Sequence, residues 1–228
     1  MAEGRMAGKR VVVTQVADYM GPAMVETFRR EGAEVIADNR DLRGPGACED
    51  LIRSAGEIDV LIANMAATEH LLMPAHETSD EMWEYMFDMM VHPLHRLCRT
   101  LLPRMYARQA GKIVVVGSVT GIRIEKAIAA SAYAAARSAQ VGYVRAVGAE
   151  AARNNVQINL IAQHFTYSET FFPESMQQRE EFREWIKTCP AGRLATGEED
   201  GELALFLASD KCNFVTGTAI PFAGGWHL

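Results

Sequence analysis

The sequence lacks any apolar run long enough to cross a bilayer, although 49% of its 228 residues are hydrophobic. Its opening, MAEGRMAGKR, leads straight into an apolar run without a signal-peptide pattern. It also lacks a basic excess, because 23 Lys and Arg residues stand against 29 Asp and Glu residues, a net charge of −6. These absences argue against nucleic acid or an anionic membrane as a partner, and they favour a cytoplasmic protein.

Cysteine is scarce and scattered. The four cysteines, at 48, 98, 189 and 212, have neither the spacing of metal ligands nor that of a disulfide framework. We therefore expect reduced structural thiols and no metal site.

Short apolar stretches alternate with helical periodicity along the chain. The predicted strands are 9–14, 33–37, 60–63, 113–116, 156–161 and 218–222, and the main predicted helices are 21–30, 81–106, 130–154 and 198–208. This alternation predicts an α/β, Rossmann-like, doubly wound parallel sheet in three αβα layers. Without a linker or repeat, the chain is expected to form one domain over 1–228.

The turn after the first predicted strand, TQVADYMG at 14–21, retains a single glycine, Gly21. In doubly wound folds this turn holds the pyrophosphate of a dinucleotide, and its glycines let the backbone approach the phosphates. The Tyr19 ring would occupy that space, and Asp18 would repel phosphate. We predict that Tyr19 lines a small pocket; the alternative is that it fills a gap in the core. About twenty residues separate the second and third predicted strands, so the adenine region is expected to be truncated.

A serine, a tyrosine and an arginine form the second informative pattern. Ser118 ends the apolar run KIVVVGS, and Tyr133 and Arg137 lie one helical turn apart in SAYAAAR. A phenol, with an ordinary pKa near 10, acts as a base at neutral pH only beside a cation that stabilises the phenolate. An arginine stays protonated and can play that part, while the serine hydroxyl binds the substrate oxygen. The alternative is an ordinary helix surface.

These motifs resemble the short-chain dehydrogenase/reductase superfamily over essentially the whole chain, and more narrowly its halohydrin dehalogenase branch. VVVTQVADYMG is similar to that branch's signature through Thr14, Tyr19 and Gly21, and GSVTG with SAYAAAR is similar to its Ser–Tyr–Arg triad. RLATGEEDGELALFLASD and the terminal AGGW are typical of the superfamily. The reductase features are replaced: Arg137 stands for lysine, Gln163-His164 for Pro-Gly, and Met90 for a helix asparagine.

The resemblance implies a lyase that converts vicinal haloalcohols to epoxides, halide and a proton, and that opens epoxides in reverse with azide, cyanide or nitrite. Tyr133 would take the proton, with Ser118 and Arg137 as its partners, and no cofactor or metal would be needed. The halide would bind where a dinucleotide otherwise lies, beside Tyr19 and the loop Gln163, His164 and Phe165. His164 could wall the pocket, hold structure or bind the anion when protonated.

The resemblance also implies a homotetramer. Trp83, Phe171 and Phe172, with the Met-rich stretch 82–90, could wall an apolar substrate pocket, or could instead belong to the core or a subunit interface. Ser118 and Tyr133 are two residues further apart than is usual in the family, which predicts an insertion within 122–130. Two other functions stay open: an NAD(P)-dependent short-chain reductase with an atypical loop, and a non-catalytic descendant.

Overall fold

A computed structural model of the chain describes residues 4–124 and 129–227. Six strands form one parallel sheet in the order β2-β1-β3-β4-β5-β6. The strands are β1 (Arg10–Val13), β2 (Glu34–Ala37), β3 (Val60–Asn64), β4 (Gly111–Ser118), β5 (Val156–Gln163) and β6 (Ala219–Phe222). The predicted α/β, doubly wound, Rossmann-like fold is therefore confirmed.

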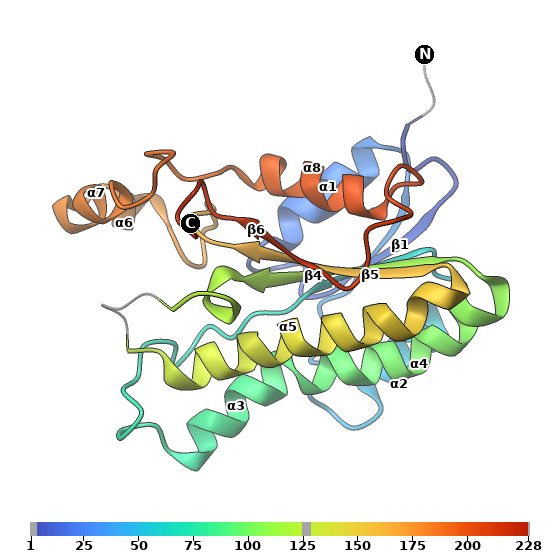
Figure 1. Cartoon of the computed structure of the whole chain (residues 1–228), viewed down its shortest axis with the longest axis horizontal. Helices are drawn as coiled ribbons and strands as arrows, with labels where there is room; N and C mark the ends of the chain where they lie inside the picture. Colours follow the sequence, from blue (N-terminus) through green and yellow to red (C-terminus); the bar gives the residue numbers. More distant parts are fainter. Residues whose placement is uncertain (1–3, 125–128, 228) are drawn as a thin grey trace.

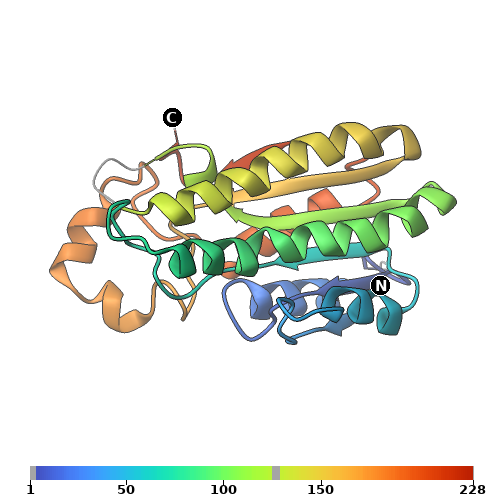
Figure 2. The same ribbon diagram turned by 90° about the horizontal axis from the view of Figure 1, so that it is seen from below.

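Helices cover both faces of the sheet (Figures 1 and 2). α1 (Gly21–Arg30) and α8 (Gly197–Ala208) pack together on one face. The other face carries α2 (Ala47–Ala55), α4 (His92–Arg108) and α5 (Ser131–Ala151), with α3 (Asp80–Met90) packed against α4 and α5. Two short helices, α6 (Glu174–Gln177) and α7 (Glu180–Ile186), and two 3-10 turns, η1 (Val119–Gly121) and η2 (Ala152–Asn154), complete the elements.

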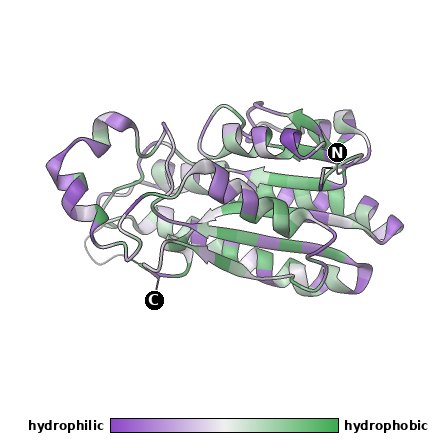
Figure 3. Ribbon diagram, turned by 90° about the horizontal axis from the view of Figure 1, so that it is seen from above, coloured by the Kyte–Doolittle hydropathy of each residue, from purple (hydrophilic) through white to green (hydrophobic). Residues whose placement is uncertain are grey.

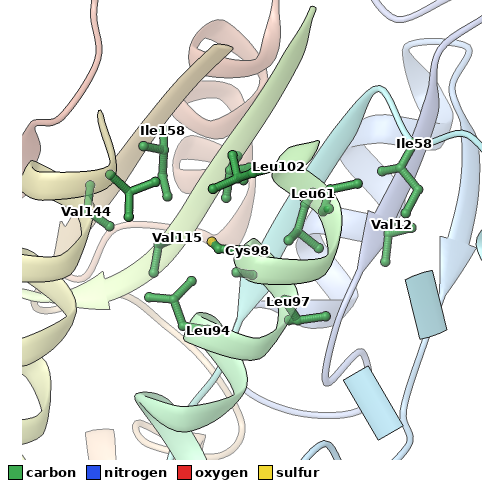
Figure 4. Packing of buried hydrophobic residues seen from close by; sticks show 14 of the residues in the cluster. Val12, Ile58, Leu61, Leu94, Leu97, Cys98, Leu102, Val115, Val144 and Ile158 are labelled. Carbon is green, nitrogen blue, oxygen red and sulfur yellow. The ribbon is translucent and has the colours of Figure 1, made fainter. Parts of the chain in front are cut away.

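The core is divided by the sheet into two layers. Figure 4 shows the layer under α4, where Leu94, Leu97 and Cys98 pack against Leu61 and Val115 of the central strands. The layer under α1 and α8 includes Met24, Phe28 and Leu205. The strands are apolar along most of their length, whereas the projecting α6 and α7 are largely hydrophilic (Figure 3). Central strands that are buried on both faces explain the continuous β-branched runs in the sequence.

One long predicted helix is wrong: residues 81–106 form two helices, α3 and α4, which meet at Val91. Pro93 lies in the first turn of α4, where its missing N–H costs no hydrogen bond, so the periodic pattern continues across the boundary. α2, α6 and α7 were not predicted. The proposed insertion within 122–130 falls partly on residues 125–128, outside the described residues.

All six strands point toward the same end of the sheet, where α6, α7 and the C-terminal segment also lie (Figure 1). Ligands of doubly wound folds bind at the carboxyl ends of the strands, so a ligand site is expected at this end of the sheet. β2 forms one edge, and no strand of the described residues lies outside it, in agreement with the expected truncation. None of the helices within residues 4–124 and 129–227 has the length and apolarity needed to span a bilayer.

Candidate active site

Tyr19 lies across the turn between β1 and α1. Its backbone adopts a left-handed conformation, with φ of 54°, and its hydroxyl donates to the Gly117 carbonyl at the end of β4, at 2.8 Å. Its ring meets that of Phe171 edge-on, with the centroids 5.2 Å apart. Burial raises the pKa of its hydroxyl, so Tyr19 stays neutral and acts as a wall.

Gly21 is required by the path of this turn. A Cβ at this position would lie 2.5 Å from the Gln15 carbonyl oxygen and from the Val16 Cα. The turn therefore packs its own backbone against the start of α1, while the Tyr19 hydroxyl is bonded across the strand ends. The Tyr19 side chain thus lies in the turn that holds pyrophosphate in dinucleotide-binding folds, where glycines ordinarily leave room for the phosphates. At the end of β2, Asp38 is paired with Arg40 at 2.6 Å, so this carboxylate already has a partner.

Arg137 is almost completely buried, at 1% exposed, in the first turns of α5. Its Nη1 donates to the Met65 carbonyl at 3.0 Å, to the Val116 carbonyl at 3.3 Å and to the Gln140 side chain at 2.9 Å. Its guanidinium carbon lies 5.2 Å from the ring centroid of Tyr133 and 5.7 Å from that of Tyr19. Its Nε and Nη2 have no hydrogen-bond partner among the described residues. This buried cation is thus placed to stabilise a phenolate or another anion.

Ser118 and Tyr133 come to the same end of the sheet by different routes. Ser118 closes β4 and caps η1, where its hydroxyl accepts from the Thr120 N–H at 3.2 Å and donates to the Thr120 hydroxyl at 3.1 Å. Tyr133 lies half-buried in the first turn of α5. Gly121 lets η1 approach α5, because a Cβ there would lie 2.6 Å from the Arg137 carbonyl oxygen. Ser118 and Tyr133 of the predicted triad therefore line one cavity, whereas the buried Arg137 does not line it and contacts the Tyr133 ring instead.

That cavity has a volume of about 570 Å³ and a mostly apolar wall. Ser118 and Tyr133 line it together with Tyr19, Gln163, His164, Phe165, Phe171 and Phe172. The structure thus brings together the predicted catalytic hydroxyls, the predicted halide-binding residues and two of the three predicted substrate-pocket residues. A site of this size, apolar with a few convergent polar groups, is typical of one that holds a small organic molecule.

Trp83, the third predicted substrate-pocket residue, does not line the cavity. It is 41% exposed on α3, stacks on Phe87 with the ring centroids 5.1 Å apart, and is not among the cavity-lining residues. Met86 and Met90 of the same helix pack in a buried cluster with Tyr133. Met86 and Met90 of the Met-rich stretch therefore belong to the core and pack against the tyrosine.

His164 lies among aromatic rings, with centroids 4.0 Å from Phe165, 4.5 Å from Trp226 and 5.6 Å from Trp185. Burial lowers the pKa of its imidazole to about 4. At neutral pH the ring is uncharged, which favours the pocket-wall role over binding an anion as a cation.

Gln163 ends β5 in register with Ser118, and its side chain is buried. Its amide Nε2 donates to the carboxyl Oδ2 of Asp200 in the first turn of α8. Burial raises the pKa of this carboxyl to about 7.

The sequence did not single out Asp200, because an acidic residue at a helix N-terminus is ordinarily solvated. It also missed Gln140, whose Nε2 donates to the Met90 carbonyl at 2.9 Å. The position of Gln140, three residues after Arg137, was a usable signal. Among the described residues, no three His, Cys, Asp or Glu side chains cluster so as to hold a metal ion.

A parallel sheet with a strand-end serine, followed by a helix that carries tyrosine and a basic residue one turn apart, defines an enzyme of the short-chain dehydrogenase/reductase superfamily. Within it, the chain belongs to the family described as "Enoyl-(Acyl carrier protein) reductase", which matches residues 5–227.

Curated relatives carry reductase names. The chain is similar to "Dehydrogenase/reductase SDR family member 6" of Danio rerio, at 28% identity over 248 residues, covering 99% of this chain and 100% of that protein. It is also similar to "3-oxoacyl-[acyl-carrier-protein] reductase FabG" of Salmonella typhimurium, at 26% identity over 247 residues, covering 97% of this chain and 98% of that protein. Both alignments are longer than this chain of 228 residues, so both relatives have residues that it lacks.

A solved structure described as "Dehalogenation enzyme" has 25% identity and a TM-score of 0.86, covering 96% of this chain and 98% of that one. Levodione reductase, at 23% identity, has a TM-score of 0.89, covering 97% and 98% of the two chains. These similarities establish the superfamily and the fold. The narrower resemblance to halohydrin dehalogenases is not established by them.

Proposed function

We propose that the protein is a halohydrin dehalogenase, which converts vicinal haloalcohols to epoxides without a nicotinamide cofactor. The observation that carries the proposal is the turn after β1. Tyr19 lies in the turn that ordinarily holds a dinucleotide's pyrophosphate, and its hydroxyl is bonded to Gly117 at 2.8 Å. A tyrosine in place of the glycines of this turn favours chemistry that transfers no hydride.

The cavity supplies the groups that this reaction needs. Tyr133, next to the buried guanidinium of Arg137, would take the proton of the substrate hydroxyl, and Ser118 would bind the same oxygen. The resulting alkoxide would displace the halide on the neighbouring carbon, so that a C–O bond forms as the carbon–halogen bond breaks. Attack within one molecule needs little entropy of assembly.

The halide would leave toward Tyr19, Gln163, His164 and Phe165, on the wall where the aromatic edges carry partial positive charge. In the reverse direction, a small anion such as azide would attack the epoxide from the same place. The solved structure described as a dehalogenation enzyme supports this proposal at 25% identity.

The alternative is an NAD(P)-dependent short-chain reductase with an atypical turn. The named relatives, "Dehydrogenase/reductase SDR family member 6" and "3-oxoacyl-[acyl-carrier-protein] reductase FabG", favour this alternative over the dehalogenase. The geometry around Tyr19 and Gly21 favours the dehalogenase.

Halide release from a panel of chloro- and bromoalcohols tests the proposal. We expect release by the wild type and a loss of at least about a hundredfold in the Tyr133→Phe variant, because the base is removed while the ring is kept. Tyr106→Phe, on α4 and outside the cavity's lining, is the matched control and should keep full activity.

Folded wild-type protein that releases no halide from any substrate would contradict the proposal. Equal release by the wild type and by Tyr133→Phe would contradict the role of the tyrosine.

A further inference from the structure

A buried carboxyl, Asp200, lies behind the cavity wall and takes no part in the proposed reaction. It is fully buried, and its Oδ2 accepts a hydrogen bond from the Gln163 amide. Its Oδ1 and the Gln163 Oε1 have no partner among the described residues. Burying a carboxyl without all of its hydrogen-bond partners lowers the stability of the folded protein, so its presence in the interior needs an explanation.

Among the described residues, no cation is paired with Asp200. Within α8, the acidic side chains of Glu198, Glu199 and Glu202 turn outward to form ion pairs with Arg30, Arg193 and Arg5. The other ionisable groups on the elements packed around α8 are Tyr19 and Asp18 of the β1–α1 turn, Glu26 and Arg29 of α1, Lys112 of β4, and His164 after β5.

Two of those neighbouring groups are engaged elsewhere. Lys112 lies at the opposite end of β4, where its ammonium donates to the Cys212 carbonyl and to Asn213, both at 2.7 Å. His164 lies among the rings of Phe165 and Trp226. Asp200 is therefore hydrogen-bonded to the Gln163 amide, and burial raises its pKa to about 7.

Asp200 does not line the cavity itself, but it contacts a residue that does. Gln163, its hydrogen-bond partner, lines the cavity in register with Ser118. Tyr19 lines the same wall, where burial raises the pKa of its hydroxyl, the Arg137 guanidinium lowers it, and the charges of Tyr133 and Asp200 raise it further. A negative charge on Asp200 would therefore repel an anion at the wall where the halide would leave.

We propose that Asp200 is a positioning residue that couples the binding of an anion to its own protonation. A small anion binds at the wall formed by Tyr19 and Gln163 while Asp200 is protonated, and it is released when Asp200 ionises. This inference rests on the proposed function, in which halide leaves at that wall. The only bond that changes is the carboxyl O–H, and the proton is exchanged with solvent.

The hydrogen bond between the two side chains gives the coupling its mechanism. An ionised Asp200 only accepts, so it engages the amide NH₂ of Gln163, as in the structure. A protonated Asp200 can donate to the Gln163 Oε1 after the amide turns over, which changes little in shape. Either protonation state thus keeps the hydrogen bond, and protonation removes a negative charge behind the wall at which the anion binds.

Bromide titrations by calorimetry between pH 6 and 8.5 test this coupling. In the wild type, we expect affinity to fall by about tenfold across this range. Titrations near pH 7 in two buffers of different ionisation enthalpy should show proton uptake with bromide.

The Asp200→Asn variant keeps the shape and the acceptor oxygen but cannot ionise. Its bromide affinity should therefore be independent of pH, and bromide binding should neither release nor take up protons. Asp210→Asn, which removes an exposed carboxylate after the end of α8, is the matched control and should behave as the wild type. If Asp200→Asn does not fold, infrared difference spectra of the wild type give the answer, because bromide should increase the band of a protonated carboxyl.

A pH-independent bromide affinity in the wild type, an unchanged pH dependence in Asp200→Asn, or no bromide-induced carboxyl band would each overturn the inference. Coupling through His164 would instead be centred near pH 4 and would survive in Asp200→Asn. Absence of bromide binding would also overturn the inference, whereas the proposed function is decided separately by halide release. A dehalogenase with pH-independent bromide affinity would retain the function and lose the coupling.

Discussion

At the scale of single residues, two buried titratable groups near the cavity have opposite effects on stability. The pKa of Asp200 is raised from 3.8 to about 7 in the folded protein, and that of His164 is lowered from 6.5 to about 4, both because burial disfavours the charged form. Between pH 4 and 7, the unfolded chain ionises Asp200 more readily than the folded protein, so stability falls as the pH rises. For His164 the unfolded chain binds the extra proton, so stability falls as the pH drops from 6.5 to 4.

Replacing Asp200 separates the two effects. We expect the free energy of unfolding of Asp200→Asn to exceed that of the wild type by about 2–4 kcal/mol at pH 8, and to equal it near pH 4. The variant should also lose stability more steeply on acidification below pH 6.5, because the contribution of His164 is no longer offset. Urea unfolding at a series of pH values measures this, with Asp210→Asn as the control. A difference of constant size at all pH values would contradict the raised pKa of Asp200.

At this scale the sequence predicted the reacting groups and missed their supports. Tyr133 and Arg137 were found because a spacing of four residues puts two side chains on one helical face. Gln140 follows the same rule at a spacing of three and was overlooked. Asp200 could not have been found by such a rule, because its partner Gln163 lies 37 residues away in sequence.

At the scale of elements, the turn between β1 and α1 is the most constrained segment of the site. A methyl group on Gly21 would meet backbone atoms at 2.5 Å, whereas a methyl group on Gly142 in α5 would meet nothing within 4 Å. We expect Gly21→Ala to lower the free energy of unfolding by more than about 2 kcal/mol, since backbone cannot move aside as a side chain can. Gly142→Ala should raise it by up to about 1 kcal/mol, because alanine favours a helix interior.

Urea unfolding of the two variants gives the comparison, and halide release shows whether the turn also positions Tyr19. Equal stabilities of Gly21→Ala and Gly142→Ala would contradict the tight packing of the turn.

The elements themselves were predicted where their patterns were long or strongly β-branched. The runs that became β4 and β5 were predicted correctly but were too short, because each strand continues into polar residues, Ser118 and Gln163, that the apolar pattern does not include. The helix over 81–106 was wrong because apolar periodicity runs through Val91 without interruption.

At the scale of the whole molecule, the order of the strands bears on cofactor use. β2 is an edge strand, and within the described residues nothing continues the sheet beyond it, although the doubly wound order that binds dinucleotides has a further strand there. Together with the pair of Asp38 and Arg40, this edge leaves little of an adenosine site.

We therefore expect no saturable binding of NADH or NADPH by the wild type, and none by Tyr19→Gly, which removes the whole side chain, including the hydroxyl bonded to Gly117. Fluorescence titration with each nucleotide measures this. Binding by the wild type would favour the reductase alternative, and binding by the variant alone would show that the ring is the sole barrier.

The sequence by itself determined the alternation of strands and helices, the place of the serine at a strand end, and the pairing of Tyr133 with Arg137. These features depend on local periodicity, which is written into neighbouring residues. The tertiary structure decided that the Tyr19 hydroxyl, 98 residues away from Gly117, closes over β4, and that Asp200 lies beneath Gln163. Such contacts depend on the order and register of the strands and on burial from solvent, and short-range patterns in the sequence do not specify them.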